Sequence, residues 1–131
     1  MKLTNKVAIV TGGGRDIGKA VSLKLATEGA KVVLNYFGSE ESANQTVNEI
    51  KANGGEAIAV KGDMTMSADV AKLVKASKDA FGNEVHILVN VVGGLVARKT
   101  LEDMDEAFWD FVINLNVKPV FLLAKNIVSL V

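Results

Sequence analysis

The chain of 131 residues contains no cysteine, one histidine and one proline. The absence of cysteine excludes disulfides, thiolate catalysis and cysteine-ligated metals, and a single histidine leaves a zinc site without ligands. Lysine and arginine together number 15, as do aspartate and glutamate, so the formal net charge is zero. A neutral chain without a basic cluster is not expected to bind nucleic acid or an anionic membrane as its main partner.

Long apolar runs are also missing. Residues 1–6 lack the apolar core of a secretory signal, and no apolar run reaches the length that spans a membrane. Hydrophobic residues are nevertheless abundant at 49% of the chain, which is enough for one globular domain over residues 1–131. The sequence therefore predicts a single soluble, cytoplasmic domain.

Short apolar, β-branched runs alternate with longer helical patterns. Strands are predicted at residues 7–10, 31–35, 57–60 and 87–90. Helices are predicted at residues 17–28, 39–53 and 67–81, and from about residue 105 to residue 131. Strands that are apolar throughout and separated by helices are typical of a parallel sheet covered on both faces. The predicted fold class is α/β, a doubly wound Rossmann-type sheet of about four strands.

Residues 11–18, TGGGRDIG, stand between the first predicted strand and the first predicted helix. Free backbone N–H groups at a helix N-terminus favour an anion, and glycines let phosphate oxygens approach the backbone closely. The segment is one residue short of a P-loop, because Ala20 stands where a hydroxyl would hold Mg²⁺. The G-x-G-x-x-G fingerprint does not fit in register either. The pattern still predicts a nucleotide site.

The segment resembles T-G-x-x-x-G-x-G, the cofactor loop of the short-chain dehydrogenase/reductase family. Three further landmarks agree in order and separation: Asp63, the segment LVNVVGG at residues 88–94, and Asn116 between Trp109 and Phe121. The chain is thus similar to the N-terminal half of a family member such as a 3-oxoacyl-carrier-protein reductase. The resemblance implies an oxidoreductase that transfers hydride between a nicotinamide and a small ketone or alcohol.

The resemblance also implies roles for individual residues. The residues expected to contact the cofactor phosphates are Gly12, Gly14, Arg15, Ile17 and Gly18. Adenine contacts fall on Asp63 and Met64, the ribose side on Asn90 and Gly93, and Asn116 belongs to the catalytic set.

Three of these residues also have structural interpretations. Asp63 is the kind of loop aspartate that caps the following helix near Ser67, and Asn90 is the kind of buried amide that ties neighbouring strands. Asn116 is compatible with a plain helix-face position. Pro119, three residues later, removes a backbone hydrogen bond, so the last helix should bend or break there.

The end of the second strand indicates which cofactor is bound. An NAD-selective site usually places a carboxylate there, and this chain has Tyr36 instead. The resemblance places Arg15 beside the 2′-phosphate of NADP, with Ser39 near it, so NADP is favoured over NAD. In the alternative interpretation Arg15 is solvated and Asn35 binds either ribose indifferently.

The chain departs from the family pattern in three ways. Asp16 replaces a glycine and places a carboxylate where pyrophosphate is expected, and Val91 and Val92 replace a smaller pair. The family's catalytic Tyr-x-x-x-Lys does not occur, since Tyr36 is the only tyrosine. We therefore expect a truncated cofactor half that is inactive alone. The apolar last helix resembles the family's dimer- and tetramer-forming surface, which predicts a homo-oligomer. The alternative function is a non-catalytic nucleotide-binding or interaction module.

Overall fold

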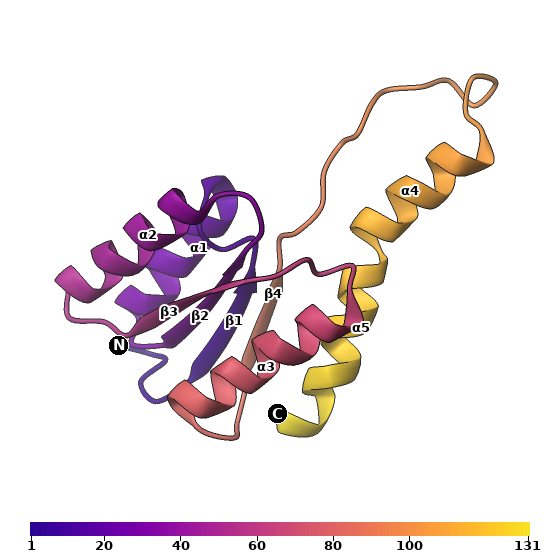
Figure 1. Ribbon diagram of the computed structural model, residues 1–131. Helices are drawn as coiled ribbons and strands as arrows, with labels where there is room; N and C mark the ends of the chain where they lie inside the picture. Colours follow the sequence, from indigo (N-terminus) through magenta and orange to yellow (C-terminus); the bar gives the residue numbers. More distant parts are fainter.

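The computed structural model describes residues 1–131 and contains one parallel four-stranded sheet (Figure 1). The strands are β1 (Val7–Thr11), β2 (Lys31–Tyr36), β3 (Ala57–Lys61) and β4 (Ile87–Asn90), paired in the order β3-β2-β1-β4. The predicted strands and the α/β class are confirmed, although β1, β2 and β3 each continue one residue further. Because the chain order reverses direction at β1, a ligand crevice is expected at the carboxyl ends of β1 and β4.

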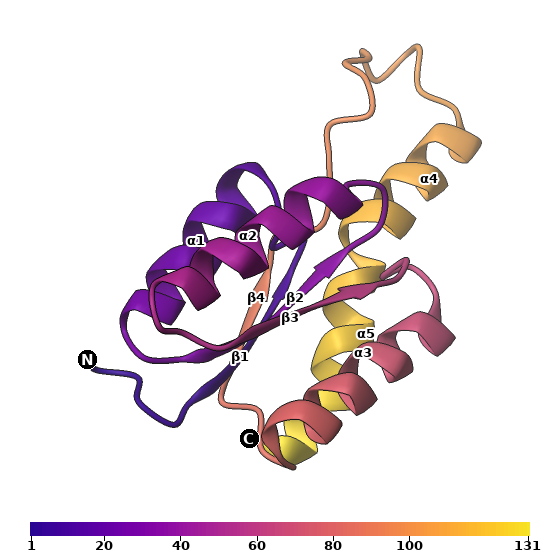
Figure 2. The same cartoon turned by 60° about the vertical axis from the view of Figure 1, so that its left-hand side comes forward.

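Helices cover both faces of the sheet, as Figures 1 and 2 show. Helices α1 (Asp16–Thr27) and α2 (Glu40–Ala52) lie on one face, and α3 (Ser67–Phe81) and α5 (Lys118–Ile127) lie on the other. Neighbouring strand residues point to opposite faces, so Ile9 packs with the α3 and α5 side while Val10 packs with the α2 side. The parallel strands are therefore buried on both faces, as their continuous apolar runs predict.

The last helical region breaks where proline predicts a break. Helix α4 (Glu106–Asn116) ends one residue before Val117, and α5 starts directly after it. Pro119 has no N–H group to donate to the carbonyl of Leu115, so the α-helical hydrogen-bond series stops there. Asp105 caps α4 by accepting a hydrogen bond from the Phe108 amide at 2.8 Å. A short 3₁₀ turn, Val128–Leu130, follows α5.

Helix α4 and the segment that precedes it extend away from the sheet (Figure 1). No residue of α4 is buried, and Trp109 and Phe111 are both 56% exposed. The exposure of these aromatic residues is compatible with the expected oligomer-forming surface on the last helix, which stays a prediction.

The stretch Glu106–Leu130 is long and apolar enough to cross a membrane by length and composition alone. This stretch differs from the expectation that no apolar run reaches membrane-spanning length. The stretch is divided at Val117 into two helices, and α5 packs against α3 and carries the buried residues Leu122 and Leu123. Length and composition are a weak criterion, because core helices of globular proteins also meet it.

Ser77 on α3 provides a test of the core. Its hydroxyl is fully buried and has no hydrogen-bond partner. An unpartnered buried hydroxyl costs roughly 1–3 kcal/mol, and alanine is the better helix former. We predict that Ser77→Ala raises the free energy of unfolding by about 1 kcal/mol, measured by urea denaturation.

Ser22 is the matched control, because it is equally buried on a helix but its hydroxyl donates to the Gly13 carbonyl at 2.8 Å. Ser22→Ala should lower the free energy of unfolding by about 1 kcal/mol. Equal losses at the two serines would contradict the assignment of Ser77 as unpartnered.

Candidate functional site

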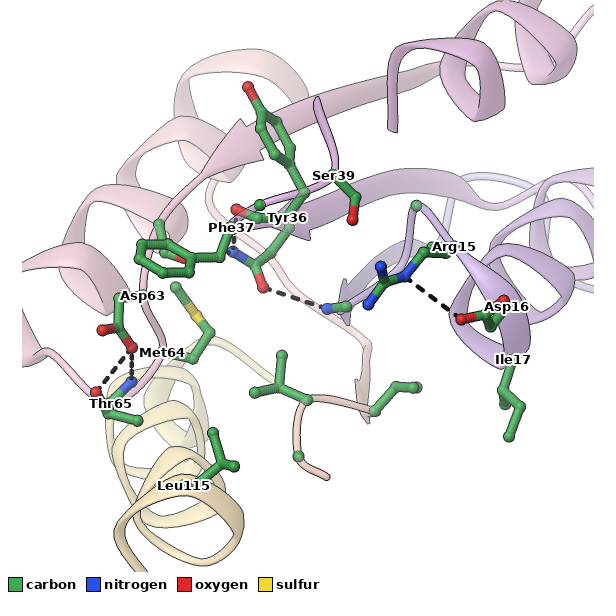
Figure 3. Close-up of a pocket in the computed structure, with 18 residues that line it drawn as sticks. Arg15, Asp16, Ile17, Tyr36, Phe37, Ser39, Asp63, Met64, Thr65 and Leu115 are labelled. Carbon is green, nitrogen blue, oxygen red and sulfur yellow. Dashed lines mark hydrogen bonds and ion pairs between the residues drawn. The ribbon is translucent and has the colours of Figure 1, made fainter. Parts of the chain in front are cut away.

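A pocket of about 540 Å³ lies at the carboxyl ends of the strands, where the fold predicts a ligand crevice (Figure 3). Its volume is within the range of small-molecule and cofactor sites. The structure brings these predicted residues together around it: Gly12, Gly14, Arg15, Ile17, Tyr36, Ser39, Asp63, Met64 and Gly93. Gly18, Asn90 and Asn116 do not line it. No group of three or more acidic, histidine or cysteine residues is placed to hold a metal ion.

The glycine turn, residues 12–14, joins β1 to α1 and leaves no room for a side chain at Gly13 or Gly14. A Cβ on Gly14 would lie 2.7 Å from the Cα of Ala43 on α2. A Cβ on Gly18 would collide with the carbonyl oxygen of Gly12. Gly18 therefore lets α1 pack against the turn. It does not line the pocket, and its role as a phosphate contact stays a prediction.

Asn35 holds the glycine turn from beneath. Its side-chain oxygen accepts a hydrogen bond from the Gly12 amide at 3.2 Å, and its main-chain oxygen accepts one from the Gly13 amide at 3.1 Å. Its side-chain nitrogen donates to the Gly62 carbonyl at 3.0 Å and to the Val60 carbonyl at 3.4 Å. Asn35 lines the pocket but is only 1% exposed, and its side chain is already bonded within the protein. The structure therefore gives it the role of holding the turn, and its alternative interpretation as a ribose ligand stays a prediction.

Three hydroxyls bind the carbonyls of the turn. Ser22 donates to the Gly13 carbonyl at 2.8 Å, while Ser42 and Thr46 donate to the Gly14 carbonyl at 2.7 and 3.0 Å. Sequence reasoning missed the two α2 hydroxyls. Their spacing of four residues, which places both on one face of a helix, was the available signal.

The start of α1 presents unpaired backbone amides. The amides of Asp16, Ile17 and Gly18 have no acceptor within the protein, as expected for the first turn of a helix. Arg15 is the N-cap residue, and its Nε lies 3.4 Å from the Asp16 carboxylate. Both side chains are mostly exposed, so their attraction contributes little to stability. The free amides and Arg15 together make this end of the pocket suited to an anion.

Asp16 has a left-handed backbone with φ of +52°. Glycine adopts this conformation without steric cost, and aspartate is one of the few other residues that tolerate it. This explains the glycine at the corresponding position of the family pattern.

The loop after β3 forms the opposite end of the pocket. One carboxylate oxygen of Asp63 accepts hydrogen bonds from the Thr65 amide at 2.9 Å and the Thr65 hydroxyl at 2.7 Å. The other oxygen has no protein partner. Asp69 holds the loop by accepting from the Asp63 amide at 2.8 Å. Met64 is 2% exposed and packs into the core, so its backbone amide is the polar group it can offer.

The segment after β4 is held by two polar side chains. The Thr11 hydroxyl accepts hydrogen bonds from the amides of Val91 and Val92 at 3.2 and 3.4 Å. Asn116 joins the segment to α4 by two hydrogen bonds. Its side-chain oxygen accepts one from the Gly94 amide at 2.8 Å, and its side-chain nitrogen donates one to the Gly94 carbonyl at 3.1 Å. The structure therefore gives Asn116 a positioning contact, and its catalytic role stays a prediction.

The remaining predicted residues differ in their surroundings. Asn90 at the end of β4 is exposed and its side chain makes no hydrogen bond, so its interpretation as a buried tie between strands is wrong. Ser39 is the N-cap residue of α2, without a side-chain capping bond. Phe37, which sequence reasoning missed, lines the pocket with 64% of its surface exposed. A lone aromatic residue after a strand carries no sequence signal of a ligand contact.

Known proteins resemble this chain in sequence and in fold. The chain is 45% identical to a 3-oxoacyl-[acyl-carrier-protein] reductase of Synechocystis sp., over 98% of this chain and 51% of that protein. It is 41% identical to a probable tetrahydroxynaphthalene reductase of Zymoseptoria tritici, over 95% of this chain and 46% of that protein. The chain thus spans about half the length of the curated relatives it matches.

Solved structures of the same family have the same fold as this chain. A short chain dehydrogenase from Burkholderia cenocepacia in complex with NADP superposes with a TM-score of 0.89 at 34% identity, covering 100% of this chain and 53% of that one. A hydroxysteroid dehydrogenase from Escherichia coli gives a TM-score of 0.88 at 35% identity, covering 98% and 53%. The family profile described as short chain dehydrogenase matches residues 6–131. The chain belongs to the short-chain dehydrogenase family.

Proposed function

We propose that these residues form the NADP-binding part of a short-chain oxidoreductase that acts on a small ketone or alcohol, with 3-oxoacyl compounds as one class of substrate. The observation that carries the proposal is the pocket itself, where free amides of α1 and the Arg15 side chain stand at one end and the Asp63 carboxylate at the other. The solved relative from Burkholderia cenocepacia is described in complex with NADP, which supports the same ligand here.

Different residues around the pocket are assigned to different parts of the cofactor. The pyrophosphate is assigned to the amides of Asp16 and Ile17 at the start of α1, because that end of a helix favours an anion. The 2′-phosphate is assigned to Arg15 with Ser39 nearby, since a guanidinium forms strong charge-assisted hydrogen bonds to phosphate. No carboxylate stands at Tyr36 to favour the plain ribose of NAD.

The base and the nicotinamide side complete the assignment. Adenine is assigned to the Asp63 carboxylate oxygen that lacks a protein partner and to the Met64 amide. The nicotinamide ribose is assigned to the segment after β4, with Gly93 in the pocket wall and Asn90 just before it. When bound, the nicotinamide supplies or takes up the hydride. Asn116 then acts by holding Gly94 in place beside it.

Turnover requires groups that these 131 residues do not include. The family's acid–base tyrosine and its lysine have no counterpart here, because Tyr36 lies at the end of β2. Cytoplasmic location and a homo-oligomer built on the exposed face of α4 belong to the same proposal. NADPH titration followed by fluorescence of the bound dihydronicotinamide tests the binding function. Binding without turnover in the complete gene product would favour the alternative, a non-catalytic nucleotide-binding module.

Arg15→Ala tests the choice of cofactor. Loss of one charge-assisted hydrogen bond to phosphate, worth roughly 1.5–3 kcal/mol, should weaken NADPH binding about tenfold to a hundredfold. NADH lacks the 2′-phosphate, so its dissociation constant should stay nearly unchanged. Lys24→Ala is the matched control, because Lys24 is an exposed cation on α1 that does not line the pocket. Equal losses for both cofactors with Arg15→Ala would contradict the assignment.

Asp16→Gly tests the departure from the family pattern. Removing a carboxylate near the pyrophosphate should tighten NADPH binding severalfold, since one like charge about 4 Å away in water costs roughly 1 kcal/mol. Glycine also fits the φ of +52° without strain. Asp16→Asn separates the two effects, because it removes the charge but keeps a side chain that tolerates this backbone. Unchanged dissociation constants for both variants would rule out a clash between Asp16 and the cofactor.

A further inference from the structure

Phe37 is an aromatic residue with no place in the hydrophobic core. It directly follows β2, 64% of its surface is exposed, and it belongs to neither core cluster. Its neighbour Tyr36 packs against the α2 side of the sheet, and Met64 packs against the α3 side. The Phe37 ring therefore contributes little to folding stability.

The position of the ring sets it apart from the other exposed aromatic residues. Trp109, Phe111 and Phe121 are also more than half exposed, but they lie on α4 and α5 and do not line the pocket. Phe37 does line it. Figure 3 draws its ring on the side of Asp63 and Met64, away from Arg15 and the start of α1, where an anion would bind.

We propose that Phe37 is a stacking platform for the purine base of the ligand. This inference rests on the proposed nucleotide-binding function and adds a residue to it. An exposed aromatic face beside a pocket offers apolar area to a flat ring, and stacking tolerates different bases because each base has a π-face. The free oxygen of Asp63 offers the complementary contact, a hydrogen-bond acceptor at the edge of the base.

The two residues would then have separable roles. Phe37 sets the affinity for any large flat base, because stacking does not depend on which groups the base carries at its edge. Asp63 sets the identity of the base, because a carboxylate accepts a hydrogen bond from an amino group but not from a carbonyl oxygen. The ligand class is a purine nucleotide, and adenine is preferred over hypoxanthine through the contacts of Asp63 and the Met64 amide at the edge of the base, not through the stack.

The test is calorimetric titration of the chain with adenosine 2′,5′-bisphosphate and with its hypoxanthine counterpart. Phe37→Ala should weaken binding of both ligands by the same factor, roughly tenfold. Phe37→Tyr should keep wild-type affinity, because tyrosine presents the same aromatic face. Phe111→Ala is the matched control, an exposed phenylalanine that does not line the pocket, and it should change nothing. Thermal unfolding of each variant shows that the exposed substitutions leave the fold intact.

The outcomes separate this inference from the function on which it rests. Wild-type binding with an unchanged affinity in Phe37→Ala would overturn the stacking role and leave the nucleotide site standing. A loss confined to the adenine ligand would also overturn it, because stacking should not distinguish the two bases. No binding of either ligand by the wild-type chain would overturn both proposals.

Discussion

The glycine turn between β1 and α1 has polar backbone groups but no side chains with which to satisfy them. Asn35 accepts from the amides of Gly12 and Gly13, and hydroxyls from α1 and α2 bind the carbonyls of Gly13 and Gly14. Buried backbone groups must be paired, so these bonds fix where both helices sit on the sheet. The same Asn35 amide donates to Gly62, which couples the turn to the loop that follows β3.

The polar groups of the pocket are thus divided between two tasks. Those beneath the turn are used inside the protein, while the amides at the start of α1 and one oxygen of Asp63 remain available to a ligand. The end of the pocket that is suited to an anion carries Arg15 and Asp16 side by side. Their opposite charges largely cancel in the field felt by a ligand that is still far from the pocket. In the proposed site, short-range hydrogen bonds at the two ends of the pocket would therefore select the ligand more than the net charge of the pocket would.

Sequence reasoning reached the fold because the fold depends on local patterns. Apolar strand runs, the glycine turn and Pro119 each act within a few residues, and the sheet and the break after Asn116 are confirmed. The family is confirmed as well. The roles of Asn35 and Phe37 depend instead on which distant segments surround them. The sequence around a polar residue in an apolar strand, or around an aromatic residue that follows it, is the same whether the side chain contacts protein, ligand or water. The local sequence therefore does not predict which contact is made.

The bonds that hold the glycine turn also have a consequence for the entropy of binding. A loop that becomes ordered only around its ligand adds its lost conformational entropy to the cost of binding. Here that ordering belongs to folding, because the turn is bonded to Asn35 and to both helices before any ligand arrives. Under the proposed function, capture of a nucleotide would therefore require no ordering of the glycine turn, and that part of the entropy cost would be absent from the free energy of binding.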